Sequence, residues 1–358
     1  MKNLLFIPIV LFLAVISAPA IQMHYQFYKE FEDADKRRLA SPPEWGRGVI
    51  SRFAKESEAY VDDHFGFRPD LIRWNIMIRI HLFGIAPLQS VIVGKDAWLF
   101  YCSEALDDGN SINDFMGSVP LSEAELENLR MRLEENNRKF AEKGIKYIVA
   151  IAPNKNTIYS EYLPERFAKN RSGTRLEQFC DYMDQRSSIK VLDLSKPMLR
   201  EKSKLPLYWA TDSHWNSFGA YVGYREIMKR ISNFYPNTGV IELAGEIAVK
   251  RWANGGDLTR ILFIQDVWPE KNDTVFQLDL TRIPSQLEKL LFRHDSFGDA
   301  LYPYLTKHFT KIIDVAPFAP FRFEAIFHER PEIVLHLFAE RYLTQAIHDD
   351  FYYKESGY

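Results

Sequence analysis

The feature that most constrains the fold is an alternation of apolar strands and amphipathic helices through most of the chain. The run "IKYIVAIAP" at 145–153 is almost continuously apolar, as in strands buried on both faces of a parallel sheet. The segment 121–144 before it predicts a helix, because Ser122 and Glu125 have the spacing of a capping box. Strands joined by helices in this way predict an α/β fold with a doubly wound, mainly parallel sheet.

Further segments continue this pattern. Two short strands flank the Gly-Lys-Asp turn within 91–101. The other predicted elements are a helix at about 173–186, a strand at 189–194, a helix after Asn216, a strand at 289–294, a helix through 300–309 and strands at 311–315 and 332–337. In such a sheet, functional residues lie at the carboxyl ends of the strands, where loops lead into helices.

The chain begins with an apolar segment. Residues 4–21 are uncharged and about long enough to cross a bilayer, so residues 1–22 predict a signal-anchor or a signal peptide. Small residues near its end would suit a peptidase, whereas Pro19 and the length favour an uncleaved anchor. We therefore expect a body outside the cytoplasm, tethered to the inner membrane through residues 4–21.

The chain is predicted to have two further parts, a helical arm at 23–88 and a catalytic domain at 89–358. Within the arm, apolar residues at helical spacing flank the sequence "DHFGFR". Its Asp63, His64 and Arg68 are interpreted as a capped junction between two helices, because polar residues around a glycine turn are commonly structural.

Composition excludes one class of partner. With 45 basic and 48 acidic residues and a net charge of −3, the chain has no basic run interleaved with aromatics, so no nucleic acid is expected. Cys102 and Cys180 are the only cysteines. In an oxidising compartment they form either one disulfide or two separate thiols, and the sequence leaves both open.

Three polar clusters lie at predicted strand ends: "APNKNTIY" (152–159), "TDSHWNSFG" (211–219) and "RHDSFGDALYPY" (293–304). In the last cluster, a strand-to-helix turn places Ser296 where a nucleophile is exposed. A serine needs a base to remove its proton, and a histidine has a suitable pKa.

The middle cluster supplies that base. His214 is the candidate, and Asp212, two positions earlier in an extended loop, can hold its other ring nitrogen. A hydrogen-bonded loop or part of a metal site would give the same Asp-x-His spacing. No further ligand stands at a usual spacing, so neither a metal nor another cofactor is expected. Asn216 is interpreted as a helix cap and Trp215 as core or pocket wall, with substrate contact as the alternative for both.

Several segments together resemble one family. Their order and sequence are similar to the alginate O-acetyltransferase family of SGNH-hydrolase-like periplasmic proteins, from about residue 36 to 345. The segments are "RRLASPPEW", "YVDDHFGFR", "GKDAWLFY", "APNKNTIYSEYLP", "TDSHWNSFGAY", "GGDLTR", "HDSFGDALYPYL" and "RPEIVLHLFAERYL". The resemblance implies a permuted SGNH-hydrolase-like fold in which the Asp-x-His pair precedes the serine.

The resemblance also implies roles for individual residues. Ser296 matches the nucleophile, His214 the base, Asp212 its orienting acid and Tyr302 an active-site tyrosine, while Lys155 and Asn154 match a turn that shapes the site. Backbone N–H groups near Ser296 and Phe297, with Asn154, are the expected oxyanion donors. One departure is His294, which stands where related sequences often have a small residue.

The implied function is transfer of acetyl groups onto an exported polysaccharide in the periplasm, through an acetyl-serine. A membrane-bound acyltransferase would supply the acetyl group. Two alternatives remain open from the sequence: a polysaccharide acetylesterase with the same three residues, and a non-catalytic scaffold of an export complex. The sequence does not identify the polysaccharide or the hydroxyl.

Overall fold

The computed structural model describes residues 6–27, 38–43, 50–102, 111–169, 173–281 and 286–347. The chain divides into two compact units. One comprises residues 1–87 with 260–264, and the other comprises residues 88–259 with 265–358. The first two residues of the predicted tether, at positions 4 and 5, lie outside the described residues.

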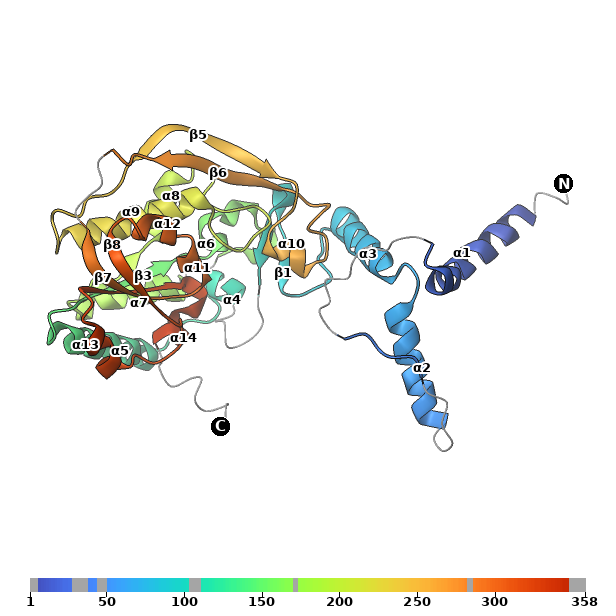
Figure 1. The fold of residues 1–358 in the computed structure, drawn as a ribbon, viewed down its shortest axis with the longest axis horizontal. Helices are drawn as coiled ribbons and strands as arrows, with labels where there is room; N and C mark the ends of the chain where they lie inside the picture. The colour runs from blue at the N-terminus through green and yellow to red at the C-terminus, as the bar shows by residue number, and fades with distance from the viewer. Residues whose placement is uncertain are drawn as a thin grey trace. The chain divides into compact units, whose positions relative to one another are not determined.

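The described part of the first unit includes the helices α1 (Phe6–Tyr25), α2 (Ile50–His64) and α3 (Arg68–Phe83) (Figure 1). By length and composition α1 can cross a membrane. The predicted junction between two helices is present, because α2 ends at His64 and α3 begins at Arg68, but no side chain caps the start of α3. Asp63 accepts a hydrogen bond from the Ala40 amide at 2.8 Å, so it has a structural partner.

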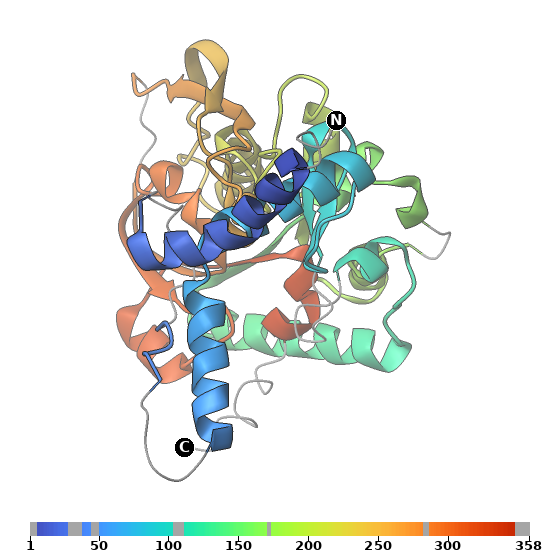
Figure 2. The ribbon, with the colours of Figure 1, turned by 90° about the vertical axis from the view of Figure 1, so that its right-hand side faces the viewer.

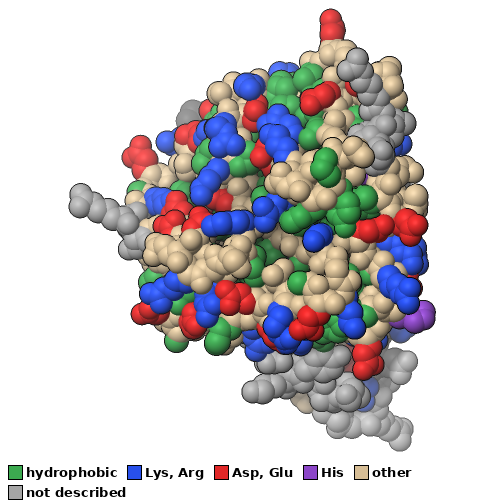
Figure 3. All heavy atoms as spheres, turned by 90° about the vertical axis from the view of Figure 1, so that its left-hand side faces the viewer, with side chains coloured by type: hydrophobic (Ala, Val, Ile, Leu, Met, Phe, Trp, Pro, Cys, Tyr) green, Lys and Arg blue, Asp and Glu red, His purple; other side chains and the backbone are tan. Residues whose placement is uncertain are grey.

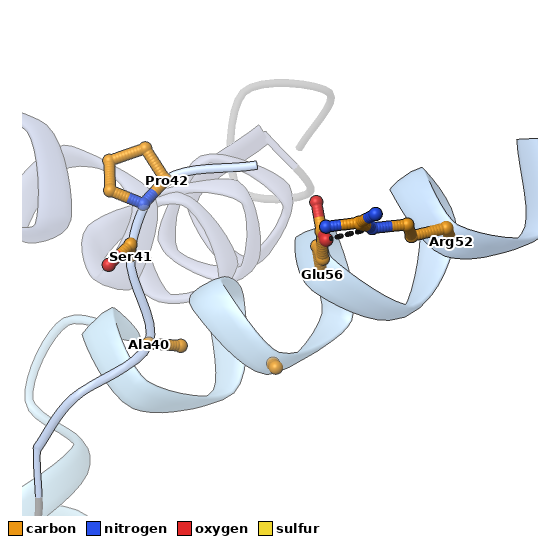
Figure 4. A pocket seen from close by; sticks show the side chains of 6 residues that line it. Ala40, Ser41, Pro42, Arg52 and Glu56 are labelled. Carbon is orange, nitrogen blue, oxygen red and sulfur yellow. Dashed lines mark hydrogen bonds and ion pairs between the residues drawn. The ribbon is translucent and has the colours of Figure 1, made fainter. Parts of the chain in front are cut away.

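A shallow hollow of about 360 Å³ lies within this unit. Figure 4 shows the segment 40–42 opposite the ion pair of Arg52 and Glu56, whose N···O distance is 2.7 Å. These lining residues include none of the predicted site residues.

The second unit is built on a five-stranded sheet. Its strands are β3 (Lys146–Ala152), β4 (Leu192–Asp193), β7 (Leu287–His294), β8 (Phe309–Val315) and β9 (Ile333–Ala339). They lie in the order β4-β3-β9-β7-β8, and every neighbouring pair is parallel. The predicted α/β fold with a mainly parallel sheet is therefore confirmed.

Each face of the sheet is covered by a separate apolar core, as the strand sequence requires. Alternate residues of β3 face opposite sides: Ile148, Ala150 and Ala152 belong to one core, and Tyr147, Val149 and Ile151 to the other. Since a strand side-chain pattern has a period of two, burial of both faces explains the continuous apolar run.

Different helices cover the two faces (Figure 1 and Figure 2). One core includes residues of α5 (Glu123–Ala141), α7 (Arg175–Arg186), α13 (Phe323–Glu329) and α14 (Leu343–Ile347). The other includes residues of α8 (Ser195–Glu201), α9 (Ser217–Ser232) and α12 (Tyr302–Leu305). The predicted capping box of Ser122 and Glu125 begins α5.

The remaining elements are short or lie at the periphery. The predicted strands on either side of the Gly-Lys-Asp turn are β1 (Val91–Val93) and β2 (Leu99–Tyr101). Four short helices are α4 (Ser111–Phe115), α6 (Lys155–Ile158), α10 (Asp257–Ile261) and α11 (Ser296–Asp299), and 3-10 turns occupy Lys95–Ala97, Ser160–Tyr162, Glu165–Phe167 and Glu340–Tyr342.

Three expectations about elements differ from the structure. The strand expected at 189–194 is reduced to the two residues of β4, and the helix expected through 300–309 to the four residues of α12. An antiparallel hairpin of β5 (Leu243–Trp252) and β6 (Glu270–Leu278) was not expected. Its strand β5 is mostly exposed, so it lacks the apolar pattern that reveals a strand in a sequence.

The two cysteines lie in different cores. Cys102 belongs to the core that includes α9, and Cys180 to the core that includes α5, and they form no disulfide with each other. On the face shown in Figure 3, basic and acidic side chains are interspersed with neutral and apolar ones, as the small net charge suggests.

Candidate active site

Ser296 is presented by the turn between β7 and α11. Asp295 caps this turn: its carboxylate accepts from the Phe297 amide at 3.0 Å and from the Ala339 amide at 2.7 Å. The second bond ties the end of β7 to the end of β9. Phe297 is fully buried, whereas Ser296 is exposed. The turn thus anchors its apolar side chain and leaves the serine hydroxyl accessible.

His214 and Asp212 lie beside that hydroxyl. The Nε2 atom of His214 is 2.7 Å from the Ser296 oxygen, although the two residues are 82 positions apart. The Nδ1 atom of His214 is 2.8 Å from Oδ1 of Asp212, which also accepts from the His214 amide at 2.9 Å. The structure therefore brings the three predicted residues into one hydrogen-bonded relay.

Trp215 and Asn216 hold the histidine loop from inside the core. The Trp215 indole donates to the Phe297 carbonyl at 3.1 Å, and the side chain is 1% exposed. Asn216 caps α9 by accepting from the Gly219 amide at 2.9 Å, and its own amide donates to two carbonyls. Substrate contact, the alternative for both residues, does not agree with this burial, because neither side chain reaches the surface.

Lys155 is a positioning residue as well. Its ammonium donates to the carbonyls of Leu99, Ala210 and Asp212 at 2.6–2.9 Å. Burial lowers the pKa of Lys155 to about 7, against the attraction of the carboxylates of Glu270, Asp212 and Asp257. Three carbonyl acceptors need three N–H donors, and only the charged ammonium has them. Lys155 therefore fixes the backbone of Asp212 and does not face a substrate.

Two oxyanion donors expected from the sequence have different surroundings. The Phe297 amide already donates to Asp295, so it is not free for an oxyanion. Asn154 follows the carboxyl end of β3, where its backbone amide donates to the Glu340 carboxylate at 2.8 Å. Its side chain is 4% exposed, and within the described residues its Oδ1 atom is buried without a partner.

Tyr302 and His294 form a polar group next to the nucleophile turn. The Tyr302 hydroxyl donates to Asp314, and the His294 Nε2 atom lies 3.2 Å from the same carboxylate. The His294 ring stacks on Phe292, with centroids 4.1 Å apart. A Cβ atom at Gly298 would lie 2.3 Å from this ring, so the glycine gives the large residue its space. Ser296 stays exposed beside it.

Asp257 was not identified from the sequence. Its Oδ2 atom lies 3.4 Å from Nδ1 of His214, and its carboxylate accepts from both the amide and the hydroxyl of Ser213. The Asp257 amide donates to Asp212 Oδ2 at 2.8 Å. It lies in the segment "GGDLTR" at 255–260, and no spacing or pattern in that segment relates it to His214.

The two carboxylates change the acidity of the base. Burial lowers the pKa of His214, but its hydrogen bonds to Asp212 and Asp257 outweigh burial and raise the pKa to about 9. Burial raises the pKa of Asp257, while His214 and Ser213 outweigh it and lower the pKa to about 2. At neutral pH the cluster therefore favours the charged imidazole, whose Nδ1–H lies between two carboxylates.

A histidine and two carboxylates this close also have the composition of a metal site, since one atom of each lies within 4.8 Å of the others. Here, however, the carboxylates accept from the ring N–H, from backbone amides and from the Ser213 hydroxyl. A cation would have to displace these donors. The arrangement fits proton transfer to and from Ser296.

Comparison with known proteins identifies the family of the chain. The family model described as "SGNH hydrolase-like domain, acetyltransferase AlgX" matches residues 91–295, more than half of the chain. The chain belongs to this family. The match runs from β1 to the residue before Ser296. Asp212 and His214 therefore lie within the matched range, and Ser296 follows it directly.

Curated relatives of this chain are named as probable alginate O-acetylases. The probable alginate O-acetylase AlgJ of Pseudomonas putida is 27% identical over 216 residues, covering 59% of this chain and 49% of the relative. The protein of that name from Pseudomonas syringae pv. tomato is 24% identical over 211 residues, covering 59% and 51%. The chain thus spans about half the length of the curated relatives it matches.

Solved structures include similar chains. The O-acetyltransferase domain of Pseudomonas putida AlgJ has 20% identity and a TM-score of 0.47, covering 71% of this chain and 92% of that domain. Pseudomonas aeruginosa AlgX has 16% identity and a TM-score of 0.48, covering 71% and 63%. The SGNH-hydrolase-like fold assignment rests on the family match and on the parallel sheet.

Proposed function

We propose that this chain is an extracytoplasmic O-acetyltransferase that places acetyl groups on hydroxyls of an exported polysaccharide. The observation that supports this most directly is the relay from Asp212 through His214 to an exposed Ser296, with both hydrogen bonds shorter than 3 Å. A serine activated in this way is suited to acyl transfer. The family description and the names of the curated relatives indicate that the transferred acyl group is an acetyl group.

In the first step, Ser296 attacks the carbonyl carbon of an acetyl donor while His214 takes the hydroxyl proton. The tetrahedral intermediate then expels the donor's leaving group, which receives that proton from the imidazolium, and an acetyl-serine remains. The Ser296 amide and Asn154 are the proposed oxyanion donors. One such donor commonly lowers a barrier by about 3 kcal/mol.

In the second step, a sugar hydroxyl attacks the acetyl-serine. His214 now removes the proton of that hydroxyl and returns it to Ser296 when the ester bond to the enzyme breaks. The product is an O-acetyl sugar and free enzyme, so no cofactor is needed. Asp212 stabilises the charged imidazole in both steps.

The place of action and the partners follow from the same proposal. The apolar α1 would address the chain to the inner membrane and place its body in the periplasm. Activated acetyl groups are made in the cytoplasm, so a membrane-bound acyltransferase is the proposed supplier. The acceptor is a polysaccharide, and alginate is the one that the names of the relatives suggest.

Replacement of Ser296 tests this function. With a chromogenic acetyl ester as donor and an oligosaccharide as acceptor, we expect Ser296→Ala to lose acetyl-enzyme formation by at least about 1,000-fold. Ser160→Ala is the matched control, because Ser160 is an exposed serine in another part of the same unit.

Intact-mass measurement should show one added acetyl group on the wild type and on Ser160→Ala, but none on Ser296→Ala. Wild-type turnover in the Ser296→Ala variant would contradict the mechanism. Release of free acetate with no acetylated oligosaccharide would instead indicate an acetylesterase.

A further inference from the structure

Asp257 is a carboxylate beside His214 that the proposed mechanism does not use. It lies at the start of α10, 43 positions after His214, and its Oδ2 atom is 3.4 Å from the Nδ1 atom of that residue. The same ring nitrogen is 2.8 Å from Oδ1 of Asp212. A single N–H hydrogen therefore faces two carboxylates that come from different parts of the chain.

The contacts of Asp257 extend over the whole histidine loop. Its carboxylate accepts from the Ser213 amide at 2.7 Å and from the Ser213 hydroxyl at 2.5 Å. Its backbone amide donates to the second oxygen of Asp212 at 2.8 Å. Asp257 thus binds each of the three consecutive residues 212, 213 and 214.

The approach of this segment to the loop is close. A Cβ atom on Gly256 would lie 2.4 Å from Cβ of Asp212 and 2.6 Å from its Oδ2 atom, so only glycine permits this contact. The Gly256 amide also donates to the Thr211 hydroxyl at 2.8 Å. The segment 256–257 is therefore fitted to the loop at every residue from 211 to 214.

We propose that Asp257 is a second positioning carboxylate for His214, which works with Asp212 to orient the imidazole toward Ser296 and to stabilise its charged form during acyl transfer. This inference rests on the function proposed for the site. Asp257 touches neither the donor nor the acceptor in this scheme, so it acts through His214 alone.

The charge around His214 agrees with this role. The groups that act on it or on its immediate partners are Asp212 and Asp257 at Nδ1, Asp295 before the nucleophile, Lys155 behind Asp212 and Arg341 over the Phe297 ring. Hydrogen bonds to the two aspartates raise the pKa of His214 against its burial. Since each aspartate contributes, removal of either should make the imidazole a weaker base.

The test is the titration of His214 in Asp257→Asn, which removes the charge but keeps an oxygen that can accept from Ser213. Full-length protein labelled with ¹⁵N-histidine is followed by NMR, and His214→Asn assigns the signal among the nine histidines. We expect the His214 midpoint to fall by about one pH unit or more in Asp257→Asn.

Asp299→Asn is the matched control, since it removes the same charge from α11, where the carboxylate is 75% exposed and lies 3.8 Å from His294. The His214 midpoint in Asp299→Asn should stay within about 0.3 pH units of the wild-type value, because solvent screens such a charge. Covalent labelling of Ser296 by a serine-directed phosphonate gives the second readout. Its pH midpoint should move with that of His214.

Coincident midpoints in Asp257→Asn and the wild type would overturn the inference. A slower labelling rate with an unchanged midpoint would also overturn it, because Asp257 would then have a structural role only. Should the variant fail to fold, the wild-type titration decides: a midpoint above about 8 supports two carboxylates at Nδ1, and one below about 8 contradicts them.

The readout separates two kinds of failure. The His214 midpoint does not depend on which group is transferred, so it reports on Asp257 even if no acetyl-serine forms. Absence of acetyl-serine in the wild type would refute the proposed function and leave the titration result standing.

Discussion

At the scale of single residues, His214 links the structure to a pH dependence. A base must be neutral to accept the Ser296 proton, and the two neighbouring aspartates outweigh burial and raise its pKa to about 9. At neutral pH most of the enzyme would then hold a charged imidazole that cannot act as the base.

We therefore expect the rate of Ser296 acetylation to rise with pH through neutrality and to level off above about pH 9. The measurement is the pre-steady-state acetylation rate across this range, with a donor that is stable at alkaline pH. A rate that is already constant from about pH 7 upward would contradict the assignment of His214 as the titrating base.

Sequence reasoning identified part of this site. Ser296 was predictable because it lies between an apolar strand and a glycine-containing turn, and Asp212 because it is two positions from His214. Asp257 was not, because it comes from a separate segment, and neither its spacing nor the burial pattern relates it to His214. The burial of Trp215 was expected from its large apolar ring, whereas the burial of Lys155 depends on tertiary contacts that no local pattern contains.

At the scale of elements, the contact between the 256–257 segment and the histidine loop predicts an effect of Gly256→Ala. The added methyl group would overlap the Asp212 side chain, with its Cα atom also only 2.9 Å away. We expect loss of acetylation by about 100-fold, because a displaced acid misaligns the base. The stability loss should be about 1–3 kcal/mol, as for other overpacked sites.

Gly239→Ala is the control for this prediction, because a Cβ atom there would have open space within 4 Å. Acetylation rates and urea unfolding of both variants give the comparison. Equal behaviour of the two variants would show that the loop can shift away from Gly256 at no cost to the site.

The elements themselves were predictable to different degrees. The strands β3, β7, β8 and β9 were found because the core strands are apolar and lie between helices with clear signals. The hairpin of β5 and β6 was missed, since β5 is mostly exposed and the pairing contains register shifts. Its stability comes from cross-strand bonds and contact with α9, neither of which leaves an apolar repeat in the sequence.

At the scale of the whole molecule, the apolar helix α1 predicts that the protein is located in a membrane fraction. Its 20 residues have a mean hydropathy of 2.2 in the most apolar window, enough for a membrane span. We expect the full-length protein in the membrane pellet, resistant to high salt and released by detergent. Recovery of a soluble form shorter by about 20 residues would show that the segment is a cleaved signal peptide.

The bond from the Trp215 indole to the Phe297 carbonyl has a consequence for how the enzyme fails on heating. It joins the residue after the base to the residue after the nucleophile, both inside the same core. The segments that carry His214 and Ser296 are therefore anchored in the same hydrophobic core. Thermal inactivation should coincide with the cooperative unfolding of this core, with no inactive but still folded species at a lower temperature.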